Sequence, residues 1–285
     1  MRIALLVALL AWPLAGEEMH LFVGGLGGEP DYETRFSSLA KEGQKLAGGE
    51  ALTGAEATKA RVLAAIAKAA RLTRDDNFTL VLIGHGTWDG VNYRFNLPGP
   101  DLTDEELRAA LDKIPAAQAV VVATSASGPV RDALKNERRA VMTATRSGTE
   151  KNAVVFPRYF VEALRDATAD ADKNEVVSAA EAFRFAEAKT KNYYETEKRL
   201  ATEHAVLDDP NGGALAGRIA MARFGSVQKA LADPSKKVLL AKKEDLERGI
   251  DRLKLEKAAM PVEEYRAKLT SLLVELARVS EEIEK

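Results

Sequence analysis

Two apolar segments of this sequence each lead into a side chain that can take part in acid–base or nucleophilic chemistry. Residues 78–83 are followed by His85 and Gly86, and residues 119–123 are followed by Ser125. Functional side chains of open α/β sheets gather at the carboxyl ends of the strands, and neighbouring strands lie about 4.8 Å apart. Histidine is a base near neutral pH, and a serine hydroxyl is a nucleophile once a base activates it. The spacing therefore predicts that these two side chains face one cleft.

A second group of oxygen-bearing side chains occupies residues 170–181, whose spacing matches the calcium loop of an EF-hand. The side-chain donors would be Asp170, Asp172, Asn174, Ser178 and Glu181, with the Val176 carbonyl as a further donor. The departure is Glu175, which stands where the loop needs a left-handed glycine. Two interpretations remain open: a weak calcium site, or a degenerate loop held by hydrogen bonds alone.

The elements that must position these residues alternate between apolar runs and helical patterns. Strands are predicted near 20–23, 78–83, 119–123 and 140–144, and helices near 32–46, 55–70, 104–113, 129–134, 154–165 and 179–194. The helix at 104–113 should open with a capping box of Thr103 and Glu106. This alternation predicts an α/β fold with a mostly parallel sheet and helices on both faces, over residues 17–225.

Several polar segments in this region have no assigned chemistry. The glycines at 24–28 follow a strand, but they lack the spacing of a nucleotide-binding loop and indicate a tight turn. His204 and the acidic residues at 208–209 are interpreted as an exposed turn rather than as metal ligands. Arg138 and Arg139 are expected to be solvated surface charges.

The C-terminal residues 226–285 have no strand pattern and predict a helical hairpin. Apolar residues recur there at alternating spacings of three and four, as in a coiled coil: Val262, Tyr265, Leu269, Leu272, Leu276, Val279 and Ile283. Met260 and Pro261 separate this helix from an earlier one, since proline favours the first helical position. The apolar seam can close within the hairpin, on the α/β domain, or on a second copy of the chain.

Residues 1–16 have the pattern of a signal peptide. Arg2 precedes an apolar run that is too short to cross a bilayer, and Gly16 is the expected cleavage position. We therefore expect a secreted or periplasmic protein with no membrane contact after cleavage. An uncleaved anchor or a buried strand is the alternative.

The composition excludes several classes of function. The chain has 285 residues, a formal net charge of −2 and no cysteine. A near-neutral charge gives no support for nucleic-acid binding. Without cysteine there can be no disulfide, thiolate metal site or cysteine nucleophile. Calcium is the only cofactor for which the sequence provides a candidate site.

Two blocks follow each other in the sequence: an apolar run ending in His85-Gly86, and then one ending at Ser125. This order resembles that of the legumain/caspase-like clan of cysteine peptidases. The resemblance covers about residues 19–225 and implies a caspase-like three-layer α/β/α sandwich. It places Ser125 at the position of the clan's catalytic cysteine and His85 at that of the catalytic histidine. It also implies that Thr145, Arg146 and Ser147 line the substrate groove.

The serine at the cysteine position leaves two functions to weigh. A serine hydroxyl ionises far less readily than a thiol, so it needs an oriented base and an oxyanion hole. Asp89 is either a candidate to orient His85 or a solvated loop residue. We expect a catalytically inactive peptidase homologue that binds a polypeptide or organises an assembly. The alternative is a serine-dependent peptidase or esterase that uses Ser125 and His85.

Overall fold

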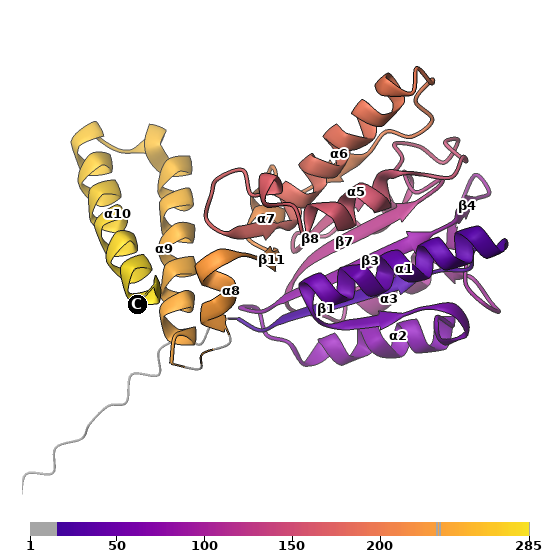
Figure 1. The fold of residues 1–285 in the computed structure, drawn as a ribbon, viewed down its shortest axis with the longest axis horizontal. Helices are drawn as coiled ribbons and strands as arrows, with labels where there is room; N and C mark the ends of the chain where they lie inside the picture. Colours follow the sequence, from indigo (N-terminus) through magenta and orange to yellow (C-terminus); the bar gives the residue numbers. More distant parts are fainter. Residues whose placement is uncertain (1–15, 232, 234, 285) are drawn as a thin grey trace, which may run out of the picture. The chain divides into compact units, whose positions relative to one another are not determined.

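The computed structural model describes residues 16–231, 233 and 235–284 of the chain, and Figure 1 shows its fold. The predicted signal peptide lies outside the described residues, apart from Gly16. The chain divides into two compact units, Glu17–Lys229 and Ala230–Lys285. No helix in the described ranges combines the length and the apolar character that crossing a bilayer requires.

A six-stranded sheet forms the centre of the first unit. The strands lie in the order β10-β8-β7-β3-β1-β2, and all neighbouring pairs are parallel except β10 with β8. Their bounds are β1 Glu18–Gly24, β2 Glu50–Leu52, β3 Asn77–Gly84, β7 Ala117–Thr124, β8 Arg139–Thr143 and β10 Val206–Asp208. The two central strands, β3 and β7, are buried almost throughout. Their continuous apolar sequences are typical of parallel strands that are covered on both faces.

Helices cover both faces of this sheet, because alternate residues of each strand enter different apolar cores. Val81 and Ile83 of β3 belong to the core under α1, α5 and α6. Leu80 and Leu82 belong to the core under α2 and α3. These helices span α1 Pro30–Ala47, α2 Lys59–Lys68, α3 Asp104–Leu111, α5 Phe156–Ala163 and α6 Ala179–Thr196, with the short helices α4 Val130–Ala133 and α7 Ala214–Gly217. Figure 1 shows α1 and α2 against this sheet. The predicted three-layer α/β class is confirmed.

One local sequence signal sets the start of a helix as predicted. The Thr103 hydroxyl accepts the Glu106 backbone N–H, and the Glu106 carboxylate accepts the Thr103 N–H in return, so the capping box is present. Such a box satisfies N–H groups that a helix start otherwise leaves unpaired. Ser178 and Glu181 form a second box at the start of α6. These same two residues are candidate ligands in the calcium-loop interpretation.

Besides β2 and β10 of the central sheet, five short strands were not predicted from the sequence. β4 Gly86–Trp88, β5 Tyr93–Phe95 and β6 Leu102–Thr103 form one small antiparallel sheet, and β9 Val176–Ser178 pairs with β11 Ala220–Arg223 in another. The exposed-turn interpretation of the acidic residues 208–209 is wrong for Asp208, which ends β10, and turn residues follow at 210–213. β10 forms because Leu207 packs on the core and pairs with Met142 of β8.

The second unit contains the predicted helical hairpin. α9 spans Lys237–Glu256 and α10 spans Val262–Glu284, and an ion pair of 2.8 Å joins Lys242 to Glu275. Val279 and Ile283 of the predicted seam are buried, whereas Val262 is 62% exposed. The end of the seam at residues 279–283 is therefore covered more fully than the end at residue 262. Use of the seam by a second copy of the chain stays a prediction.

Arg139 is buried, so its assignment as a solvated surface charge is wrong. Its side chain is 1% exposed and donates to the Gln118 side chain at 2.8 Å, the Leu134 carbonyl at 2.8 Å and Asp112 at 2.9 Å. These acceptors compensate for the removal of the guanidinium from water. Burial is the main cause that lowers the pKa of Arg139, and the bond to Asp112 opposes it.

Candidate functional site

The ends of β3 and β7 bring His85 and Ser125 close along the sheet, as the sequence predicts. The last pair in the register of these strands is Gly84 with Thr124. His85 and Ser125 are the next residues on each strand. Both blocks therefore emerge at the carboxyl edge of the sheet, where α/β proteins place their functional side chains.

The Ser125 hydroxyl is engaged by backbone atoms rather than by the imidazole. Its Oγ donates to the Gly86 carbonyl at 3.1 Å and accepts the Gly86 N–H at 3.2 Å, and the residue is 3% exposed. Within the described chain, this hydroxyl has no hydrogen bond to the His85 ring. Without a base the hydroxyl keeps its proton and is a poor nucleophile.

The requirement for glycine at Gly86 comes from packing at the same place. A Cβ on this residue would lie 2.5 Å from the Tyr93 ring and 2.7 Å from the Ser125 carbonyl. The Tyr93 hydroxyl in turn lies 2.6 Å from the Thr124 hydroxyl. Gly86 thus permits the strand ends to approach each other closely.

His85 lies among aromatic side chains. Its ring makes edge contacts with Tyr32 at 4.7 Å and Phe36 at 5.0 Å between centroids, and the residue is partly buried. Burial is the main cause that lowers the pKa of His85, the positive charge of Arg35 lowers it further, and Glu29 opposes the shift. The imidazole is therefore neutral at pH 7, which is the form that a base requires, but it lacks an orienting carboxylate among the described residues.

Asp89 does not supply that carboxylate. Its oxygens accept the backbone N–H groups of Asn92 at 2.8 Å and Val91 at 2.9 Å, and they pair with Arg94 at 2.6 Å. The Asn92 and Val91 N–H groups, followed by Arg94, lower the pKa of Asp89 to about 2. Asp89 therefore shapes the turn between β4 and β5.

The predicted groove segment contains one inward-facing residue and two nearer the surface. Thr145 is fully buried, and its hydroxyl accepts the Gly128 N–H at 3.1 Å and lies 3.1 Å from the Ser127 hydroxyl. Arg146 is exposed, and the Ser147 hydroxyl lies 2.8 Å from that of Thr149. Thr145 thus fixes the turn after Ser125, and it is not accessible to a ligand.

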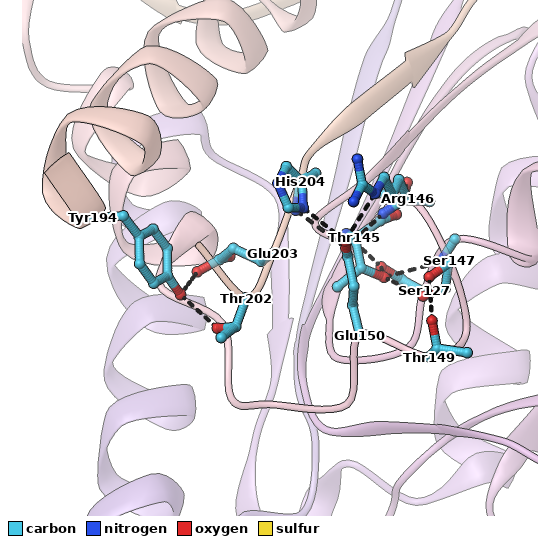
Figure 2. A network of polar contacts seen from close by, with 12 residues as sticks. Ser127, Thr145, Arg146, Ser147, Thr149, Glu150, Tyr194, Thr202, Glu203 and His204 are labelled. Atoms are coloured by element: carbon cyan, nitrogen blue, oxygen red, sulfur yellow. Dashed lines mark hydrogen bonds and ion pairs between the residues drawn. The ribbon is translucent and has the colours of Figure 1, made fainter. Parts of the chain in front are cut away.

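Glu150 and His204 form a hydrogen-bonded pair that no sequence pattern indicated, and Figure 2 shows it within a polar network. His204 Nδ1 lies 2.7 Å from Glu150 Oε1. The other oxygen of Glu150 accepts the Arg146 N–H at 3.0 Å and the His204 N–H at 3.2 Å. The Glu150 carbonyl accepts the N–H of Ala126, which directly follows Ser125. Glu150 therefore connects the Ser125 turn to two loops.

Glu203, the neighbour of His204, forms a second connection. Its carboxylate is 3% exposed and accepts the N–H groups of Val155 at 2.7 Å and Phe156 at 3.1 Å, together with the Tyr194 hydroxyl at 2.9 Å. Burial raises the pKa of Glu203, and these three donors oppose the rise. Figure 2 shows the Tyr194–Glu203 contact. The carboxylate holds the start of α5 against the end of α6.

The candidate calcium loop brings three carboxylates together. Oxygens of Asp170, Asp172 and Glu181 lie within 4.8 Å of one another. Burial raises the pKa of Asp172, and the negative charges of Glu181 and Asp170 raise it further. The Asn174 oxygen accepts the Val176 N–H at 2.7 Å, and the Glu181 carboxylate completes the cap of α6. The donor types suit calcium, but several of these oxygens already have partners within the loop, so both interpretations remain open.

Glu175 adopts the left-handed conformation that the loop requires, with φ of +68°. This conformation costs a residue other than glycine about 1–2 kcal/mol. The Glu175 carboxylate accepts the N–H groups of Ser226 at 2.9 Å and Val227 at 3.1 Å, in the first turn of α8, Gly225–Leu231. The side chain thereby offsets the conformational cost by capping a helix, as negative groups do at helix starts.

Comparison with known proteins identifies a fold but no family. No family model matches the sequence, and no curated protein matches it. The structure is similar to that of protein GSU0716 from Geobacter sulfurreducens, with 15% identity and a TM-score of 0.51 over 73% of this chain and 100% of that one. It is also similar to drICE, with 8% identity and a TM-score of 0.43 over 69% of this chain and 89% of that one.

A third similar structure is that of pro-sf-caspase-1, with 10% identity and a TM-score of 0.42 over 70% of this chain and 89% of that one. Identities this low bear on fold and not on activity.

The environment of His85 predicts a pH dependence of stability. In the unfolded chain histidine titrates near pH 6.5, whereas the folded pKa is lower. Between these two values the unfolded state binds more protons, so acidification destabilises the fold. In denaturant titrations from about pH 7 to about pH 5, His85→Phe should lose less stability than the wild type. Tyr32→Phe, which retains the imidazole, should lose as much as the wild type; equal losses in all three proteins would contradict this interpretation of His85.

The calcium interpretation predicts a thermal shift. A calcium concentration about tenfold above the Kd stabilises the folded state by about 1.4 kcal/mol. This corresponds to a rise in Tm of about 3–6 °C. The rise should disappear in Asp172→Asn, which removes one carboxylate of the loop, and persist in Asp31→Asn, which removes an exposed carboxylate outside it. An unchanged wild-type Tm in millimolar calcium would leave the hydrogen-bonded loop as the correct interpretation.

Proposed function

We propose that this chain is an exported, catalytically inactive relative of caspase-like peptidases that binds polypeptide. The observation that carries the proposal is the Ser125 hydroxyl, which is 3% exposed and hydrogen-bonded to both backbone groups of Gly86. A serine nucleophile requires an accessible hydroxyl in contact with an oriented base. Here the hydroxyl has a structural partner, and the histidine has aromatic neighbours.

The geometry of the sheet edge supports polypeptide binding as the function of a chain that does not catalyse hydrolysis. Loops that follow β1, β3, β7 and β8 meet at one edge, as in α/β proteins that bind ligands there. The turn after Ser125 is tied to the loop of residues 145–150 through Ala126 and Glu150. An edge that is held this firmly provides a preorganised surface, which lowers the entropic cost of binding. Export rests on the sequence of residues 1–16.

A serine-dependent hydrolase is the second candidate, favoured by the adjacent positions of His85 and Ser125 beyond the last paired residues of β3 and β7. Catalysis by this route would require the Ser125 hydroxyl to leave Gly86 and turn to the imidazole. Backbone N–H groups of the turn would then have to serve as oxyanion donors. The two candidate functions predict different reactivities of Ser125, and this reactivity can be measured.

Labelling with a serine-reactive fluorophosphonate separates these candidates. The wild type should not be labelled under conditions that label an active serine hydrolase to completion, because the hydroxyl is buried and lacks a base. Ser125→Ala and His85→Ala should therefore match the wild type. Labelling of the wild type that is lost in both variants, but retained in the more exposed Ser147→Ala, would establish the hydrolase instead.

A further inference from the structure

Two adjoining cavities, of about 400 Å³ and about 200 Å³, form a groove on the first unit that no sequence pattern indicated. Its walls come from α1, from the start of α5, and from the end of α6 with the loop that follows it. The arginines and tyrosines that line it are Tyr32, Arg35, Arg158, Tyr193, Tyr194 and Arg199. Among the described residues, no Asp or Glu lines either cavity.

The groove is cationic. Arg35, Arg158 and Arg199 are exposed, and within the described ranges none of them has an ion-pair partner. Arg35 lies 4.6 Å from the Tyr32 ring centroid, and Arg158 lies 5.4 Å from that of Tyr159. Stacking of this kind leaves the N–H groups of a guanidinium free to donate, and they match a carboxylate in bidentate geometry.

The groove also presents aromatic surface beside these charges. Tyr32 and Tyr193 are partly exposed, and the Tyr193 ring packs edge-on against Tyr194 at 5.3 Å between centroids. Aromatic rings of this kind offer large contact area at a low cost in side-chain entropy. A ligand that combines carboxylates with an aromatic group would use both features.

Hydrogen bonds hold the walls of the groove in place. The Tyr194 hydroxyl lies 3.0 Å from that of Thr202, and both residues line the groove. Glu203 joins Tyr194 to the Val155 N–H and so ties the end of α6 to the start of α5. The Glu203 carboxylate is engaged by these donors and is not part of the lining. A site fixed in this way loses little freedom when it binds.

Tyr32 connects this groove with the strand ends. Its ring lines the larger cavity and also contacts the His85 ring. Arg35 lies near enough to the same imidazole to lower the pKa of His85. The groove therefore begins beside the carboxyl edge of the sheet and leads away from it over α1.

The shape of the site favours a polypeptide over a nucleic-acid strand. Grooves for single-stranded nucleic acid follow the backbone with cations over several nucleotides. Here the three guanidinium groups surround two small adjoining cavities. The chain as a whole has a net charge of −2, which does not attract an extended polyanion. A few acidic side chains next to an aromatic one fit this arrangement better.

We infer that the groove binds an acidic, aromatic-containing segment of a polypeptide through Arg35, Arg158 and Arg199. The inference rests on the proposed polypeptide-binding function and specifies the class of segment that is bound. Carboxylates of the segment pair with the guanidinium groups, and its aromatic side chain packs against Tyr32 and Tyr193.

Fluorescence anisotropy with a short fluorescein-labelled peptide of alternating Glu and Tyr tests this inference. The wild type should bind this peptide more weakly as salt increases, and it should not bind the counterpart in which Gln replaces Glu. Arg35→Gln and Arg199→Gln should each weaken binding about tenfold, because each removes one charge-assisted hydrogen bond to the peptide. Arg74→Gln is the matched control, because Arg74 is exposed and lies outside the groove; it should bind as the wild type does.

Equal affinity of the wild type and both groove variants would overturn the assignment of this groove and leave the proposed polypeptide-binding function standing. Failure to bind the acidic peptide, or tighter binding of a single-stranded oligonucleotide, would overturn the inferred class of ligand. Labelling of Ser125 by the fluorophosphonate would refute catalytic inactivity without affecting the anisotropy result. Circular dichroism of each variant confirms that the fold is intact.

Discussion

The hydrogen bonds between the Ser125 hydroxyl and the backbone of Gly86 determine how the carboxyl edge of the sheet is built. They join the ends of β3 and β7 directly after their last paired residues. Both hydrogen bonds of the hydroxyl go to Gly86 rather than to the His85 imidazole. Because Gly86 lacks a side chain, Tyr93 can close the space beside it. We therefore propose a structural role for this position, although the position resembles a catalytic one.

Two glutamates connect the loops around this edge of the sheet. Glu150 connects the turn after Ser125 to His204, and Glu203 connects the start of α5 to Tyr194. Carboxylates that accept several N–H groups at once can be buried at little net cost. The result is a set of loops fixed in position around a cationic groove. Such an arrangement is suited to recognition, which needs a stable surface, and it does not require a reactive group.

The central strands and the helix starts could be predicted from the sequence because their signals are local. An uninterrupted apolar run indicates a parallel buried strand, and residues 78–83 and 119–123 both form one. The Thr103–Glu106 box lies within one helical turn. Arg139 was misjudged because its acceptors, Asp112, Gln118 and Leu134, come together only in the fold. The Glu150–His204 pair spans 54 positions, and no spacing rule indicates it. The aromatic neighbours of His85 lie on α1, so the sequence of the strand that leads to His85 does not indicate them.

The most direct test of the central claim is the free energy of unfolding of Ser125→Ala, measured by denaturant titration. A structural hydroxyl whose loss leaves the Gly86 N–H and carbonyl unpaired in a buried place should cost about 1–3 kcal/mol. Replacement of a catalytic group, in contrast, commonly leaves stability unchanged or raises it, since active sites trade stability for function. A clear loss of stability in Ser125→Ala would agree with a structural role for this hydroxyl. An unchanged or increased stability would contradict that role and make Ser125 a candidate nucleophile again.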